Sequence, residues 1–184
     1  MSSHAVAAST IAPALRRLYF VRFGFALVWA GLLFTSASKL GPVSVALLVL
    51  YPLFDVAAAL VDLRSSQGAK PPLGLYVNIA ISGIAGIGLA VAVTSGIPAV
   101  LRVWGAWAIV SGLVQLAVGI GRRKMGGQGA MIASGAISAV AGTTFVLQAA
   151  QPGASLVNLA GYAALGGLFF LVSAIRLGRS PEAH

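Results

Sequence analysis

Chemically reactive side chains are scarce in this chain, which has no cysteine, two histidines and three acidic residues among 184 positions. The absence of cysteine excludes disulfide bonds, thiolate metal sites and cysteine nucleophiles. The histidines, His4 and His184, have no other metal ligand near them in the sequence. No serine has a histidine and an acid within reach, and the acids supply no catalytic carboxylate pair. We therefore expect no enzymatic activity, no metal and no cofactor.

Charge is scarce as well. Only 8% of the residues are charged and 59% are hydrophobic, whereas soluble domains carry about 25% charged residues. Lipid can solvate such a surface and water cannot. The net charge of +9 comes from basic residues at the ends of apolar runs. We therefore expect the partners to be the lipid bilayer and its anionic headgroups, with no binding of nucleic acid.

The clearest apolar run lies between Arg102 and Arg122 and contains nineteen uncharged residues. As a helix it is roughly 28 Å long, close to the hydrocarbon thickness of a bilayer. Trp104 and Trp107, near its start, are expected to lie at the membrane interface, where such rings are common. Similar runs predict six transmembrane helices at about residues 18–36, 43–63, 73–94, 103–121, 130–150 and 155–177. The predicted fold class is therefore an all-α integral membrane protein.

These spans are expected to form one membrane domain over residues 14–178, built from three helical hairpins. The hairpins cover about residues 18–63, 73–121 and 130–177. Residues 1–13 are expected to form a disordered N-terminal tail, and residues 179–184 a C-terminal tail. The N-terminal stretch has no basic residue before its apolar part, so it does not resemble a cleavable signal peptide.

The basic residues are divided unequally between the two predicted sides of the membrane. Ten of the twelve lysines and arginines flank the N-terminus, the second and fourth loops and the C-terminus. Only Lys39 and Arg102 lie on the other side. Because cytoplasmic loops are enriched in lysine and arginine, this division predicts that both termini are cytoplasmic.

The three predicted hairpins share a sequence period of about 55 residues. Matching positions hold a proline in the turn, an aromatic residue in the second helix and an arginine at its end. The prolines are Pro42, Pro98 and Pro152; the aromatics are Tyr51, Trp107 and Tyr162; the arginines are Arg64, Arg122 and Arg176. Each hairpin begins and ends on the same side, so the repeats are predicted to be parallel in topology rather than inverted.

Residues 104–112 (WGAWAIVSG) resemble the central motif of the HdeD family, bacterial acid-resistance membrane proteins. Residues 161–167 and 51–55 resemble weaker copies of this motif, and the resemblance covers about residues 18–177. In the first copy, Pro52 and Val56 depart from the usual pattern of small residues. The resemblance implies six helices in the bacterial inner membrane and a role in acid or envelope stress. It implies no catalytic site.

Asp55 is the sharpest candidate for a functional residue because it lies well inside the second predicted span. An ionised carboxylate at that depth costs about 2.5–3.5 kcal/mol unless it is paired, protonated or hydrated. Arg22 enters the first span from the same side, and its long side chain can reach toward Asp55. One interpretation is a proton-sensitive group near neutral pH. The other, which we favour, is a structural ion pair that locks the first hairpin.

Polar amide side chains also occur in the spans or at their ends, and we predict that they form interhelical hydrogen bonds. They are Asn78, Gln115, Gln148 and Asn158. Small residues recur every fourth position, as in the series Ser134, Ser138 and Gly142, and such stripes favour close helix packing within the bundle.

These observations leave three hypotheses. The first is a non-enzymatic membrane protein of acid or envelope stress tolerance that acts through its bundle, its lipid contacts or a protein partner. The second is a small channel or proton-coupled transporter, which would require a polar path through the bilayer. The third is an accessory subunit of a larger membrane complex. A homo-oligomer is compatible with each of them.

Overall fold

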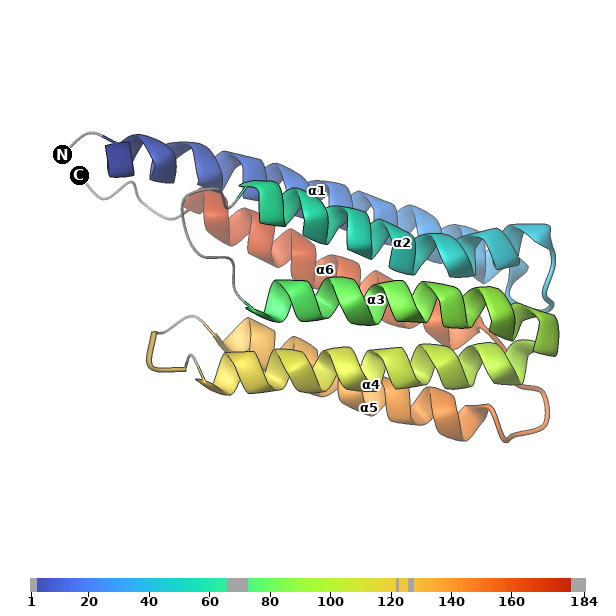
Figure 1. The fold of residues 1–184 in the computed structure, drawn as a ribbon. Coiled ribbons are helices and arrows are strands. Elements are labelled where there is room, and N and C mark those ends of the chain that lie inside the picture. The colour runs from blue at the N-terminus through green and yellow to red at the C-terminus, as the bar shows by residue number, and fades with distance from the viewer. Residues whose placement is uncertain (1–2, 66–72, 122, 126–127, 180–184) are drawn as a thin grey trace.

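The computed structural model describes residues 3–65, 73–121, 123–125 and 128–179, and these residues are almost entirely helical. The long helices are α1 (Ser3–Ser36), α2 (Pro42–Ser65), α3 (Leu73–Ala92), α4 (Ile97–Gly121), α5 (Gly129–Gln148) and α6 (Val157–Arg179). Two short 3-10 turns, η1 (Val93–Ser95) and η2 (Arg123–Met125), follow α3 and α4. The six long helices run side by side as one elongated bundle (Figure 1).

All six long helices contain a segment long and apolar enough to cross a membrane. These segments are 13–36, 42–64, 73–95, 97–121, 129–148 and 157–178, so the six predicted spans are confirmed to within a few residues at most ends. Large apolar side chains such as Val28, Ile84 and Ile87 are 65–72% exposed on the outside of the bundle. Because monomers in water rarely expose so much apolar surface, the outer face suits a lipid environment.

The first helix is longer than its membrane-spanning segment. Helix α1 begins at Ser3, so residues 3–13 continue the helix and do not form the disordered tail that we predicted. Four alanines in this stretch, Ala5, Ala7, Ala8 and Ala12, explain the difference, since alanine has the highest helix propensity of any residue. Residues 179–184, the predicted C-terminal tail, lie mostly outside the described residues.

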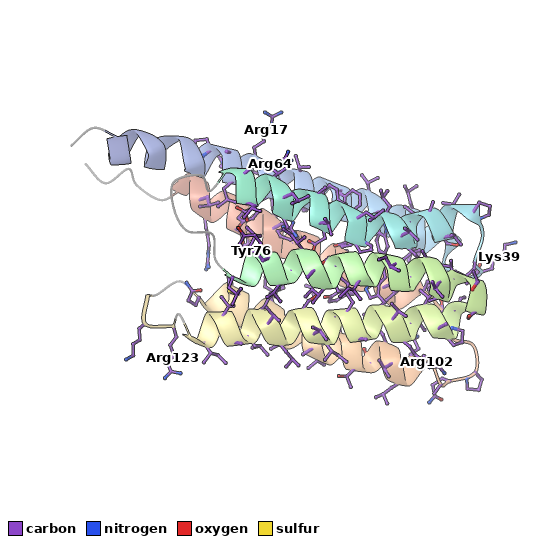
Figure 2. All side chains as sticks on the ribbon, in the orientation of Figure 1. Arg17, Lys39, Arg64, Tyr76, Arg102 and Arg123 are labelled. Atoms are coloured by element: carbon purple, nitrogen blue, oxygen red, sulfur yellow. The ribbon has the colours of Figure 1, made fainter. Side chains whose placement is uncertain are left out.

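The start of helix α1 and the end of helix α6 lie at the same end of the bundle, as an even number of crossings requires (Figure 1). We call this the terminal end. Figure 2 shows Arg17, Arg64 and Arg123 near the terminal end and Lys39 and Arg102 near the opposite end. The unequal division of basic residues is therefore a property of the folded molecule as well as of the sequence.

Neighbouring helices form a ring in the order α6, α1, α2, α3, α4 and α5. The most extensive contacts join α4 to α5 and α1 to α6, whereas α5 and α6 contact each other little. Close packing therefore does not follow the three predicted hairpins, and the hairpin repeat stays a prediction. The boundary between α5 and α6 is the weakest junction in the ring, and we call it the α5–α6 seam.

Glycines bring α4 and α5 into backbone contact. A Cβ atom added to Gly112 would lie 2.6 Å from the carbonyl oxygen of Gly135, and one added to Gly119 would lie 2.8 Å from Ile132. Gly142 packs in the same way against the backbone of Gly105. Small residues allow helices to approach this closely where no hydrophobic effect drives them together. The predicted packing role of Gly142 is confirmed.

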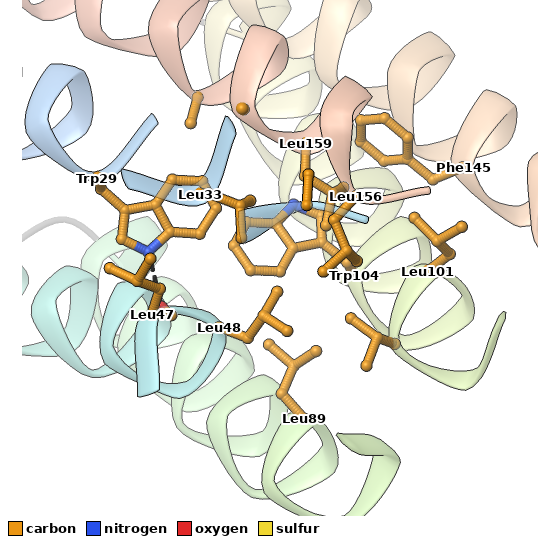
Figure 3. Packing of buried hydrophobic residues seen from close by; sticks show 14 of the residues in the cluster. Trp29, Leu33, Leu47, Leu48, Leu89, Leu101, Trp104, Phe145, Leu156 and Leu159 are labelled. Carbon is orange, nitrogen blue, oxygen red and sulfur yellow. Dashed lines mark hydrogen bonds between the residues drawn. The ribbon is translucent and has the colours of Figure 1, made fainter. Parts of the chain in front are cut away.

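The opposite end of the bundle is filled by apolar side chains, which we call the plug. Its centre consists of Leu33, Leu48, Leu89, Leu101, Leu156 and Leu159, all fully buried, and Figure 3 shows them around Trp29 and Trp104. The indole nitrogen of Trp29 donates a hydrogen bond of 2.7 Å to the carbonyl oxygen of Leu47. The plug seals this end of the bundle.

The two tryptophans of α4 pack inside the bundle, whereas side chains turned toward the membrane interface were expected. Trp104 is 1% exposed and stacks on Trp29 with ring centroids 5.3 Å apart. Trp107 contacts Trp104 edge-on, with centroids 5.2 Å apart. Aromatic pairs of this kind add about 0.5–1.5 kcal/mol beyond their buried area. Interior aromatic contacts therefore outweigh the preference of tryptophan for the headgroup region.

A candidate intramembrane binding site

The Asp55 carboxylate lies at the junction of three helices and accepts hydrogen bonds from side chains of α1 and α3. Arg22 of α1 donates to Oδ1 and forms an ion pair with the carboxylate. Asn78 Nδ2 and Ser82 Oγ of α3 each donate to Oδ2 at 2.8 Å. Both side chains of the ion pair are nearly buried, at 15% and 12% exposure. The predicted pairing of Asp55 with Arg22 and the predicted interhelical bond of Asn78 therefore both occur.

The Arg22 guanidinium is held on a second side by an aromatic ring. Its central carbon lies 4.3 Å from the centroid of the Phe170 ring of α6, a cation–π contact. Asp62, two helical turns beyond Asp55 on α2, also interacts electrostatically with Arg22. One guanidinium therefore links α1, α2 and α6. This arrangement fixes the positive charge in the interior of the bundle.

A cavity of about 440 Å³ begins beside this cluster and is lined by residues of all six long helices. Toward the terminal end its wall includes Asp62, Gly74 and Ser173. Its deepest part is bounded by Tyr51 and Trp104, which belong to or pack against the plug. The bundle therefore has a hollow half near the terminal end and a sealed half near the opposite end. The volume lies within the range of small-molecule sites.

Helix α4 contributes to the cavity wall three residues whose buried polar atoms have no hydrogen-bond partner among the described residues. These groups are the Trp104 indole nitrogen, the Ser111 hydroxyl and the Gln115 side-chain carbonyl. Leaving a buried polar group without a partner costs about 1–3 kcal/mol. The spacing of seven and then four residues puts all three groups on one helix face. The residues of α4 in the cavity wall therefore keep an unused hydrogen-bonding capacity.

Tyr51, Trp107 and Tyr162, the matching aromatics of the predicted repeats, all line the cavity. Each contacts a residue about 25 positions earlier, in the preceding helix. Tyr51 packs on Phe25 with ring centroids 5.5 Å apart. Trp107 Nε1 donates to Ser82 Oγ at 3.2 Å, and the Tyr162 hydroxyl donates to Ser138 Oγ at 2.9 Å.

The remaining predicted polar residues are placed differently. Gln115 lines the cavity, but its carbonyl oxygen forms no interhelical bond with the described residues. The buried side-chain oxygen of Gln148, at the end of α5, also has no hydrogen-bond partner among the described residues. Asn158 is exposed near the start of α6 and does not line the cavity. Of the four amides, only Asn78 joins the Asp55 cluster.

Asp62 is a cavity residue that the sequence analysis did not single out. It lies within the apolar segment 42–64 and lines the cavity together with Asp55. The signal was present in the sequence, since a spacing of seven residues returns to the same helix face. Ser82 and Phe170 carried no comparable signal, because their roles depend on which helices become neighbours.

A groove of about 640 Å³ follows the α5–α6 seam on the outside of the bundle. Ala133, Leu168 and Val172 line the groove alone, whereas Ala130, Leu165 and Phe169 line both the groove and the central cavity. Arg176 lies at its terminal end. The groove and the cavity therefore share a wall at the weakest junction of the ring.

Comparisons with family models, with curated proteins and with solved structures find no match for this chain. The fold is therefore that of an all-helical protein whose six long, apolar helices fit a multi-pass membrane protein.

Proposed function

We propose that the chain is a small, non-enzymatic transporter of the bacterial inner membrane and that the described conformation is open toward the cytoplasm. This proposal develops the second of the three hypotheses. A transporter must offer its substrate a binding site near the middle of the membrane that is open to one side only. The observation that carries the proposal is the pairing of a hollow terminal half with a sealed opposite half.

The charge distribution supports the orientation. The hollow half is the half that carries most of the arginines, and basic residues are enriched on the cytoplasmic side of membrane proteins. The cavity would therefore receive its substrate from the cytoplasm or from the inner leaflet. The Asp55 cluster, which joins α1, α2 and α3, lies in the wall of that cavity and is placed to respond to what binds there.

Single cysteines can test this proposal, because the chain has no cysteine of its own. Ser134 lines the cavity on α5, whereas Ala136, two residues later, is exposed on the outside of the same helix. We expect Ser134→Cys to react with a charged, membrane-impermeant maleimide in inside-out vesicles and not in intact cells. Ala136→Cys should not react, because a thiol needs water to ionise.

A third variant probes the plug. Ala160 is 3% exposed within it, and Ala160→Cys should react from neither side. A Ser134→Cys thiol that reacts only from outside the cell would refute the orientation. Failure of that thiol to react from either side, while the protein is folded and inserted, would refute the open cavity and with it the proposed function.

The physiological setting that we propose is acid or envelope stress, which rests on the resemblance of residues 104–112 to the HdeD motif. Ser134→Trp would fill the cavity, and Ala136→Trp would add the same bulk on the lipid face. We expect a deletion strain to lose acid survival, Ala136→Trp to restore it and Ser134→Trp to fail. Normal acid survival of the deletion strain would refute the proposed role in acid stress, and the proposal that the protein is a transporter would stand.

A further inference from the structure

The described wall of the cavity carries more negative than positive charge. Its Asp, Glu, Lys and Arg residues are Arg22, Asp55 and Asp62, which sum to a formal charge of −1. The single positive group is already engaged, since Arg22 is paired with Asp55, interacts electrostatically with Asp62 and is stacked on Phe170. A bound anion would face two carboxylates and one committed guanidinium. The electrostatics of the wall therefore favour a cation.

Aromatic rings make up much of the remaining wall. Nine of the lining residues are aromatic: Tyr19, Phe25, Tyr51, Phe54, Trp104, Trp107, Tyr162, Phe169 and Phe170. The face of an aromatic ring carries negative charge density and attracts a cation within about 6 Å of its centroid. Such rings also provide a large apolar contact area. The wall thus suits a ligand that is both positively charged and hydrophobic.

The unpartnered groups of α4 add acceptors to this wall. The Gln115 carbonyl oxygen and the Ser111 hydroxyl belong to residues that line the cavity, are themselves buried and receive no hydrogen bond from the described residues. A carbonyl oxygen can only accept, so its natural partner is a donor such as an amine N–H. Hydrogen-bond acceptors, aromatic ring faces and carboxylates all favour a ligand that is positively charged and carries hydrogen-bond donors or an apolar body.

We propose that the cavity binds a lipophilic organic cation, an amine or quaternary ammonium or phosphonium ion with an aromatic or aliphatic body. Its charge lies on the α2 side of the cavity near Asp62, and its body packs against the aromatic side chains of α4 and α6. This inference rests on the proposed function, for which it names the substrate class. The shared wall with the groove at the α5–α6 seam gives such a lipid-soluble ion a short path from the membrane.

Two probe ions of nearly equal size and opposite charge test the proposal, tetraphenylphosphonium and tetraphenylborate. Binding to the full chain in lipid nanodiscs can be followed by calorimetry and by quenching of tryptophan fluorescence, with empty nanodiscs as the background. Two of the three tryptophans, Trp104 and Trp107, line the cavity. We expect saturable binding of the phosphonium and at least tenfold weaker saturable binding of the borate.

Asp62→Asn should weaken phosphonium binding at least tenfold. The matched control is Glu182→Gln, which removes the third acid of the chain far from Asp62 in the sequence. Equal affinities for the two ions, tighter binding of the borate, or equal losses in the two variants would each overturn the proposal. The wild-type comparison of the two ions needs no variant, so it stands even when Asp62→Asn fails to fold.

The outcome also separates this inference from the proposed function. A reactive Ser134→Cys thiol combined with no binding of either ion would leave an open cavity and refute the organic-cation class. An unreactive thiol would refute the open cavity itself. Binding of the phosphonium that protects the Ser134→Cys thiol from maleimide would support both, because Ser134 and Asp62 line the same cavity.

Discussion

The ion pair of Arg22 and Asp55 gives the most quantitative prediction. Two unit charges about 4 Å apart attract by about 4 kcal/mol at an effective dielectric constant of about 20. Exposures of 15% and 12% leave little water to screen the pair. Removing one partner leaves the other charge buried without compensation, which typically costs about 3–5 kcal/mol. Replacing both with neutral side chains removes that penalty.

We therefore expect Arg22→Gln and Asp55→Asn to destabilise the protein by about 3 kcal/mol each. Because the double variant carries neither buried charge, it should be at least as stable as either single variant, which gives a coupling free energy of at least about 3 kcal/mol. This coupling corresponds to a change of roughly 150-fold in the unfolding equilibrium constant. Reversible unfolding in mixed micelles, followed by circular dichroism, measures all four proteins.

Asn158→Ala provides the control for this cycle, because Asn158 is exposed near the start of α6, away from the pair. Combined with Arg22→Gln it should give an additive result within about 0.5 kcal/mol. A coupling below about 0.5 kcal/mol between Arg22 and Asp55 would refute the reasoning. Such a result would mean that water or lipid headgroups compensate each charge in the absence of the other.

Three further predictions use the same purified protein. Gly112→Ala should lower the free energy of unfolding by about 1–3 kcal/mol, because the new Cβ atom would lie 2.6 Å from the Gly135 carbonyl oxygen. The control Gly83→Ala, whose Cβ atom meets nothing within 4 Å, should be neutral or stabilising by up to about 1 kcal/mol. Equal effects of the two substitutions in the unfolding assay would contradict the close α4–α5 packing. Trp29→Phe should cost about 1–3 kcal/mol through the lost indole hydrogen bond, and an unchanged stability would argue against that bond. Ala133→Trp should slow phosphonium quenching in stopped-flow fluorescence without changing its equilibrium affinity; an unchanged rate would exclude the groove as the path.

The six spans could be predicted from the sequence because bilayer thickness and backbone satisfaction impose length and hydropathy directly. The partnership of Asp55 and Arg22 was also predictable, since a buried carboxylate needs a cation at a similar depth. Both inferences depend on one helix or on two neighbours in the chain. They needed no knowledge of the remaining helices.

The cavity could not be predicted in this way. Its position depends on α1 packing against α6 and on α5 standing apart from α6, and apolar helices in lipid carry no hydropathy signal for choosing partners. For the same reason Trp104 was expected at the interface and Asp62 was not singled out. Each assignment considered one helix against the bilayer, whereas the residue's environment came from the helices opposite.

The position of the cavity follows from how each part of the ring is held together. In lipid no hydrophobic effect collapses a hollow bundle, so each pair of helices must be joined by packing or by polar contacts. Asp55 joins α1, α2 and α3, and the glycines join α4 to α5. On the other side, α6 packs so closely on α1 that a Cβ atom added to Gly167 would lie 3.1 Å from the Cβ atom of Ala26. The α5–α6 seam has few contacts of either kind. A change in cavity volume on ligand binding therefore meets the least resistance there, where the groove already shares its wall with the site.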